Sequence, residues 1–213
     1  MTRVRYALMA ILLFACSSSL HAEYGYAGMK IGPGIGVIYG ADAHYEAPAP
    51  IMSLNAFLTI KLWDYLALQP ELAYEMKGYQ ALTYDGVPIK RFHYVSLLLL
   101  FKGFFDVEDF KLQPYAGAEV AFLQEAEELT GSFSADVSRY YSWLDVGVVA
   151  GFEVFFPLPV EQLYITGDVR GEIGVLNFDS TGFFPPAGSS QDRIYLDKKN
   201  LVFYALVGMA YQF

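Results

Sequence analysis

The chain has 213 residues, of which 54% are hydrophobic and 17% aromatic, and its formal net charge is −9 at pH 7. This length suits one domain or one β-barrel, and the apolar content is above that of an average soluble domain. A transmembrane helix is excluded, because the densest apolar patch, Val95 to Phe101, is far shorter than the ~18 residues required and contains a serine. Nucleic acid is excluded as a partner, because the chain has no basic stripe.

The first 22 residues are typical of a secretory signal peptide, with two early arginines, an apolar core and a small, polar end at Ala22. We therefore predict a signal peptide over residues 1–22 and one barrel domain over residues 23–213. A second interpretation stays open: residues 13–16, which end in Cys16, are similar to a bacterial lipobox. Cleavage after Ala22 is favoured, since a lipid anchor is redundant for an embedded protein. Cys16 is the only cysteine, so a disulfide framework is excluded.

Beyond residue 22, apolar and other residues alternate in eight segments, which predicts strands. The segments are Tyr26–Tyr39, Ile51–Trp63, Tyr65–Tyr79, Ile89–Phe104, Phe110–Gln124, Tyr140–Phe156, Leu163–Phe178 and Asn200–Phe213. They are longer than the ~5–6 residues usual in globular proteins. They also exceed the ~9–11 residues with which a tilted strand crosses a bilayer.

The connections between these segments alternate in length. The short ones are Asp64, Phe105–Asp109 and Pro157–Gln162, and the long ones are Gly40–Pro50, Gln80–Pro88, Glu125–Arg139 and Asp179–Lys199. An up-and-down meander places all odd connections at one end and all even ones at the other. Outer-membrane barrels have short periplasmic turns and longer extracellular loops, so the sorting favours a membrane barrel.

The two faces of each segment differ in the way a membrane barrel requires. In the seventh segment, Val169 and Ile173 lie on one face, and Asp168, Arg170 and Glu172 lie on the other. A soluble barrel points its apolar face inward, whereas a membrane barrel points it toward lipid. The predicted fold is therefore an all-β, eight-stranded antiparallel up-and-down transmembrane β-barrel.

The charges of the polar face are predicted to point into the lumen. They are Lys30, Lys61, Glu71, Glu75, Lys77, Lys102, Glu119, Asp145, Glu153, Asp168, Arg170 and Glu172. Eight strands leave an interior that side chains just fill. We therefore expect a structural network of ion pairs, in preference to a pore lining or a ligand site.

Three prolines lie inside predicted strands, where each lacks an N–H for the ladder. Pro33, Pro70 and Pro114 all fall in the lipid-facing phase, where a bulge could accommodate them. The alternative is that each of these strands breaks in two.

Aromatic residues gather toward both ends of the predicted strands, as interfacial girdles do. We assign Trp63, Tyr65, Phe104, Phe105, Phe110, Phe155, Phe156 and Phe213 to the short-turn end, and Tyr39, Tyr74, Tyr79, Tyr94, Tyr140, Tyr141, Trp143 and Phe203 to the long-loop end. The last segment is predicted to close the barrel, with Tyr211 and Phe213 on its lipid face and as its assembly signal.

Several stretches resemble the PorT-like outer-membrane β-barrel family. They are LALQPELAYEMKG (Leu66–Gly78), YVSLLLLFKG (Tyr94–Gly103), LQPYAGAEVAFL (Leu112–Leu123), DVGVVAGFE (Asp145–Glu153), DVRGEIGVLN (Asp168–Asn177) and NLVFYALVGMAYQF (Asn200–Phe213). The sequence departs from the family pattern at Ser96, where proline is usual, and at Arg170–Gly171. The resemblance implies a Gram-negative-type outer membrane and mostly no known biochemical activity. A secretion role does not transfer on fold alone.

The sequence offers little for catalysis. His44 and His93 are the only histidines after residue 22, so a His or Cys metal cluster is not expected. His93 and Ser96 are similar to the pair of outer-membrane lipid A deacylases, but a spacing of three puts them on opposite faces of a strand. We expect no catalytic residue, no cofactor and no metal site.

The predicted function is that of an exported, non-enzymatic integral outer-membrane protein with a structural or surface-interaction role. The alternatives are a narrow channel, a component of an envelope transport or secretion machine and, less favoured, a lipid-modifying enzyme. The expected partners are outer-membrane lipid, the barrel assembly machinery and an envelope protein of unknown identity. Acidic loop residues (Glu125, Glu127, Glu128 and Asp136) are candidates for contacts with a surface partner or a divalent cation, or are simply solvated.

Overall fold

The computed structural model describes residues 25–41, 43, 46–81, 87–108, 110–131, 133–177 and 198–213. Its elements are β1 (Gly25–Tyr39), β2 (Glu46–Trp63), β3 (Leu66–Ala81), β4 (Ile89–Gly103), β5 (Phe105–Val107), β6 (Phe110–Thr130), β7 (Phe133–Asp136), the 3-10 helix η1 (Ser138–Tyr140), β8 (Leu144–Pro157), β9 (Leu163–Gly174) and β10 (Lys199–Gln212). Within these ranges, no helix is long and apolar enough to cross a membrane. The signal peptide predicted over residues 1–22 lies outside the described residues.

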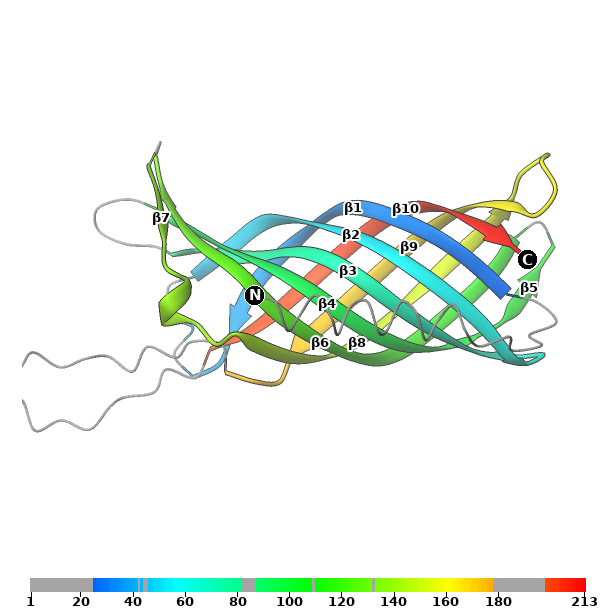
Figure 1. Ribbon diagram of the computed structural model, residues 1–213, viewed down its shortest axis with the longest axis horizontal. Helices are drawn as coiled ribbons and strands as arrows, with labels where there is room; N and C mark the ends of the chain where they lie inside the picture. Colours follow the sequence, from blue (N-terminus) through cyan, green and yellow to red (C-terminus); the bar gives the residue numbers. More distant parts are fainter. Residues whose placement is uncertain are drawn as a thin grey trace, which may run out of the picture.

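Eight long strands form a closed antiparallel ring in the order β4-β3-β2-β1-β10-β9-β8-β6, and the pairing of β4 with β6 completes it. Figure 1 shows the strands tilted around one barrel, with β5 and the end of β10 at one end and β7 at the other. We call these the turn end and the loop end. Within the described residues, the short strands β5 and β7 each pair with β6 alone. The predicted eight-stranded antiparallel barrel is confirmed.

Two predicted long connections are partly strand. β1 ends at Tyr39 and β2 begins at Glu46, and β6 continues to Thr130 and folds back as β7. The predicted long connections Gly40–Pro50 and Glu125–Arg139 contain Pro48, Pro50 and an acidic run. The sheet nevertheless continues past them, because β2 absorbs its prolines next to a register shift and the acidic run lies at the loop end, where no apolar face is needed.

Two other predicted strands are shorter than expected. β8 begins at Leu144, because residues 138–140 form η1, and β9 ends at Gly174. Both changes lengthen connections at the loop end, so shorter and longer connections still alternate and still sort to the two ends of the barrel.

The side chains are sorted as in a membrane barrel. On β9, Val169 is 49% exposed whereas Arg170 is 1% exposed, and on β10 Val207 is 65% exposed whereas Leu206 is 2% exposed. An outward Lys or Arg at mid-bilayer costs about 2–4 kcal/mol, which explains why the charged phase points inward.

The three strand prolines point outward, as predicted, but not at bulges. On either side of Pro33, Ile31 of β1 pairs with Val207 of β10, and Gly34 pairs with Tyr204. Both strands therefore advance by three residues between these two pairs, and the register is unchanged. The β1–β10 pairs skip Pro33, whereas the β1–β2 pairs include it. The missing N–H thus removes pairing on one side only, and the strand stays continuous. Pro70 and Pro114 likewise lie in unshifted registers.

The girdle assignment was wrong for several rings. Tyr79, Tyr94 and Tyr141 are buried inside the barrel at the loop end, and Phe155 is buried at the turn end. The alternation accounts for this, because Tyr79 shares the inward phase of Lys77, and Phe155 that of Glu153. Other assigned rings do face outward, among them Trp63, Tyr65, Phe105, Trp143, Phe156 and Phe203.

Candidate functional site: the charged lumen

Eleven of the twelve predicted lumen charges lie inside the barrel and are at most 3% exposed. The exception is Lys61, whose side chain is 32% exposed and whose Nζ lies 3.2 Å from Asp64 Oδ1. Lys61 lines a cavity of about 230 Å³ at the turn end, because it lies in the last turn-end residues of β2. The buried charges form two groups along the barrel axis.

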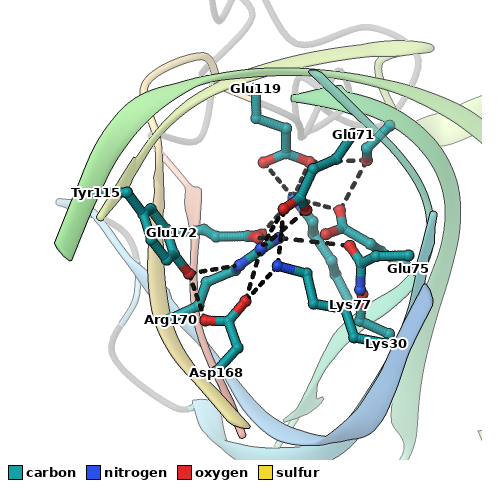
Figure 2. Close-up of polar contacts among 12 residues, drawn as sticks. Lys30, Glu71, Glu75, Lys77, Tyr115, Glu119, Asp168, Arg170 and Glu172 are labelled. Carbon is teal, nitrogen blue, oxygen red and sulfur yellow. Dashed lines mark hydrogen bonds and ion pairs between the residues drawn. The ribbon is translucent and has the colours of Figure 1, made fainter. Parts of the chain in front are cut away.

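The turn-end cluster consists of Lys30, Glu71, Lys102, Glu153, Asp168 and Arg170. Lys30 Nζ lies 2.8 Å from Glu71 Oε1 and 2.6 Å from Asp168 Oδ2. Arg170 Nη2 reaches the same two carboxylates, at 2.9 Å from Glu71 Oε2 and 3.0 Å from Asp168 Oδ2. Figure 2 shows these side chains converging from β1, β3 and β9. Two cations therefore share two anions at the centre of the lumen.

Further contacts complete the turn-end cluster. Lys102 pairs with Glu153, which also lies 3.5 Å from Lys30 Nζ. The hydroxyl of Tyr115 donates to Asp168 Oδ1 at 2.5 Å and accepts a hydrogen bond from Arg170 Nε at 3.1 Å. Three cations thus face three carboxylates, and the arrangement leaves this cluster formally neutral. Its six charged residues come from five strands, β1, β3, β4, β8 and β9, so the cluster connects these strands across the lumen. Removing one partner of such a buried pair costs about 3–5 kcal/mol.

The loop-end cluster consists of Glu75, Lys77, Glu119, Asp145 and Glu172. Lys77 Nζ lies 2.7 Å from Glu119 Oε1, 3.4 Å from Glu172 Oε2 and 3.5 Å from Glu75 Oε2. Ser96 Oγ lies 2.7 Å from Glu75 Oε2 and 2.8 Å from Glu119 Oε1. Asp145 Oδ2 accepts a hydrogen bond from Asn200 at 2.8 Å. Here one cation faces four carboxylates.

Aromatic and aliphatic layers lie around the two clusters. Phe92 packs against Tyr141 at the loop end, with ring centroids 4.7 Å apart. Tyr26 packs against Phe155 at the turn end, with centroids 5.0 Å apart. A middle layer of Ala73, Leu98, Leu100, Tyr115 and Val149 is also buried. In the part of the chain that the structure describes, side chains therefore fill the bore at several levels.

The sequence reasoning missed the uncharged members of the lumen. Gln69 donates to Glu71 Oε1 at 2.5 Å and accepts a hydrogen bond from Thr59. Asn55, Gln113, Thr166 and Asn200 are also buried. All of them lie in the inward phase of their strands, so the alternation that located the charges also located these residues. The prediction named only the charged side chains of this face, because the burial of a charge is more costly than the burial of a neutral polar group.

His93 and Ser96 lie on opposite faces of β4. His93 is on the outer face, where Nδ1 lies 2.8 Å from the Tyr74 hydroxyl and Nε2 lies 3.4 Å from Glu127 Oε1. Ser96 is buried among the lumen carboxylates. The two side chains cannot form a serine–histidine dyad.

The β6–β7 hairpin projects from the loop end of the barrel (Figure 1). Phe133 at its tip is 81% exposed. The hydroxyl and the backbone N–H of Ser138 donate to Asp136 Oδ1 at 2.6 and 2.9 Å, which holds the pKa of that carboxyl below its ordinary value. The hairpin thus presents an apolar tip, and the Asp136 carboxylate lies at the other end of β7.

The closed ring and its sorted faces define a small membrane-spanning β-barrel of the outer-membrane type. No protein-family model matches the chain, and no curated protein sequence matches it. The PorT-like resemblance therefore stays a prediction.

Solved structures of outer-membrane barrels are similar in fold. The attachment invasion locus protein Ail of Yersinia pestis, in complex with the heparin analogue sucrose octasulfate, is 16% identical, with 89% of this chain and 99% of that chain covered and a TM-score of 0.45. Neisserial surface protein A is 11% identical over 89% and 97% of the two chains, with a TM-score of 0.47. A major outer membrane protein of Thermus thermophilus is 15% identical over 88% and 99%, with a TM-score of 0.47. These likenesses concern the fold alone.

Proposed function

We propose that the protein is a non-enzymatic integral outer-membrane barrel with a closed lumen, exported through a cleavable signal peptide, whose exposed loop end contacts an envelope or surface partner. The observation that carries this proposal is the neutral, fully buried ion-pair cluster around Arg170. A channel needs a continuous aqueous path, whereas this cluster crosses the bore. The lumen charges therefore act as a structural core.

The surface role rests on the β6–β7 hairpin. An exposed aromatic such as Phe133 is the kind of side chain that anchors protein contacts. The exposed carboxylate of Asp136, at the other end of β7, would favour a basic partner, whereas Glu127 and Glu128 lie close to His93 and Lys90 of the chain itself. Membership of the PorT-like family is part of this proposal and is supported by the sequence stretches given above. A component of a larger envelope machine fits the same features.

A closed lumen predicts an electrical result. Purified protein in a planar bilayer should show no large, stable conductance, because layers of packed side chains and the Arg170 cluster block the bore. Single-channel recording at low and high salt checks this. A steady open state of porin size would contradict the closed lumen.

The proposed orientation places the loop end outside the cell. A cysteine introduced by Ser134→Cys, at an exposed position of β7, should react with a membrane-impermeant maleimide in intact cells. A cysteine introduced by Glu161→Cys, at an exposed position of the β8–β9 turn, should react only after the outer membrane is permeabilised. The reverse pattern of labelling would overturn the orientation.

A further inference from the structure

The two lumen clusters differ in charge balance. The turn-end cluster has equal numbers of cations and carboxylates. Among the described residues, the loop-end cluster has only Lys77 facing Glu75, Glu119, Asp145 and Glu172. Arg170 adds little, because its Nη1 lies 3.8 Å from Glu172 Oε1 and its Nη2 pairs with Glu71 and Asp168. An isolated buried carboxylate is too costly to remain unpaired. The loop-end cluster therefore requires positive charge beyond that of Lys77.

Several oxygens of the loop-end cluster are available for such a charge. Both oxygens of Glu172, Oε1 of Glu75 and Oδ1 of Asp145 are buried and accept no hydrogen bond from the described residues. The phenol of Tyr204, on β10, is also buried without a hydrogen-bond partner among those residues. Tyr204 is 2% exposed, lies in the inward phase of β10 and is close enough to Glu75 and Glu172 to interact electrostatically with both. A neutral phenol oxygen that faces carboxylates is suited to binding the same cation.

The spacing of the carboxylates fits a metal ion. One oxygen each from Glu75, Glu119 and Glu172 lies within 4.8 Å of the others. Two ligands of one Ca²⁺ ion can lie up to about 5 Å apart, because Ca–O distances are about 2.3–2.6 Å, whereas the limit for Mg²⁺ is about 4 Å. Ca²⁺ takes about 6–8 oxygen ligands, and the three carboxylates, each of which can bind through one or both oxygens, offer up to eight together with the hydroxyls of Ser96 and Tyr204. Figure 2 shows Glu75, Glu119 and Glu172 directed toward Lys77.

We propose that Glu75, Glu119 and Glu172 bind a divalent cation of the calcium class inside the loop-end half of the lumen, with Tyr204 as a neutral ligand. The Lys77 ammonium lies within 3.5 Å of an oxygen of each of these carboxylates, so it competes with the ion for them. Tyr79, Phe92, Tyr94 and Tyr141 cover the cluster toward the loop end. The ion enters during folding and exchanges slowly afterwards.

The test uses the full mature chain, refolded from urea into detergent micelles in the presence of Ca²⁺. After gel filtration in chelator, elemental analysis should find close to one calcium per folded barrel, and refolding in chelator should give a barrel with a lower melting temperature. Refolding with Tb³⁺ should give tyrosine-sensitised luminescence, because Tyr204 is adjacent to the ion. Heat-modifiable migration on a gel verifies the fold of every sample.

Three variants make the test specific. Glu172→Gln should weaken retention about tenfold, and Lys77→Met should strengthen it about tenfold, which corresponds to ~1.4 kcal/mol in each direction. Asp64→Asn, at a side chain that is fully exposed at the turn end, should change nothing. Retention by wild type that Glu172→Gln does not reduce, or loss of all calcium from folded wild type in chelator, would overturn the proposal. If folded wild type loses all its calcium in chelator, protons bound to the loop-end carboxylates would supply the missing positive charge. If Lys77→Met does not fold, the wild-type and Glu172→Gln measurements decide.

Discussion

Arg170→Met should destabilise the barrel more than any other single substitution in the lumen, by about 3–5 kcal/mol. Arg170 is 1% exposed, and its Nη2 contacts Glu71 at 2.9 Å and Asp168 at 3.0 Å. Methionine has a similar volume but no charge. The variant therefore leaves two buried carboxylates with Lys30 as the cation that they share, and it removes the donor to Tyr115.

Unfolding of the refolded protein by urea in detergent measures this effect, with heat-modifiable migration as the sign of the folded state. Lys61→Met is the matched control, because that ammonium lies in the same inward phase but is partly exposed and pairs with an exposed Asp64, an interaction worth about 0–1 kcal/mol. The double variant Arg170→Met with Glu71→Gln should be more stable than the sum of the two single losses predicts, because the residues share one network. A loss below ~1 kcal/mol for Arg170→Met would show that the cluster does not stabilise the barrel.

The barrel was predictable from the sequence because the bilayer imposes a strict rule on the membrane-spanning strands. Lipid on the outside and a narrow lumen on the inside give opposite chemistries to neighbouring residues, as Val169 and Arg170 illustrate. The strand bounds were least accurate beyond the bilayer, at Glu46 and Thr130. There, water solvates both faces, so the alternation that marks a strand is lost while hydrogen bonding with β3 and β4 continues.

The alternation along each strand also predicted which charged side chains point into the lumen, but it did not predict which of them form ion pairs with each other. Nothing in the spacing of Lys30 and Asp168 indicates that their side-chain atoms lie 2.6 Å apart, because they come from β1 and β9, which do not pair with each other. The lateral order of a ring fixes which strands are neighbours, whereas contacts across the lumen depend on stagger and side-chain length. The unequal charge of the two clusters follows from those contacts.

Aromatic residues show how composition can mislead when phase is ignored. Tyr79 and Tyr94 were assigned to a girdle from their position along the strands, yet they are 1% and 0% exposed. Their phase is that of Lys77 and Ser96, which point into the lumen. Because a narrow interior can hold rings as well as ions, the direction of an aromatic side chain has to be taken from the alternation.

The seam between β10 and β1 is the other place where a small change should have a large effect. Phe213 donates its backbone N–H to Gly25 O at 3.1 Å, and Gly25 donates to Phe213 O at 3.2 Å, so this pair forms the final rung at the turn end. The Phe213 ring lies over Gly25, where an added Cβ would come within 2.6 Å of the ring. Glycine therefore lets the ring pack across the seam. Tyr211 is on the same outer face and donates to Gln162 Oε1 at 2.6 Å.

Deleting Phe213 should leave most of the protein exported but unfolded in the periplasm, because the deletion removes the closing rung and, by our proposal, part of the signal that Phe213 and Tyr211 give to the assembly machinery. Backbone groups without partners are costly at a membrane edge. Phe213→Ala keeps the rung and removes only the ring, so an intermediate yield would separate closure from recognition. Gln212→Ala is the matched control, since it loses one hydrogen bond from Tyr164, worth about 1 kcal/mol, while its backbone N–H still donates to Gln162 O at 2.7 Å. The measurement is the amount of heat-modifiable protein in purified outer membranes. Wild-type amounts after deletion of Phe213 would show that neither the rung nor the ring is needed to close the barrel.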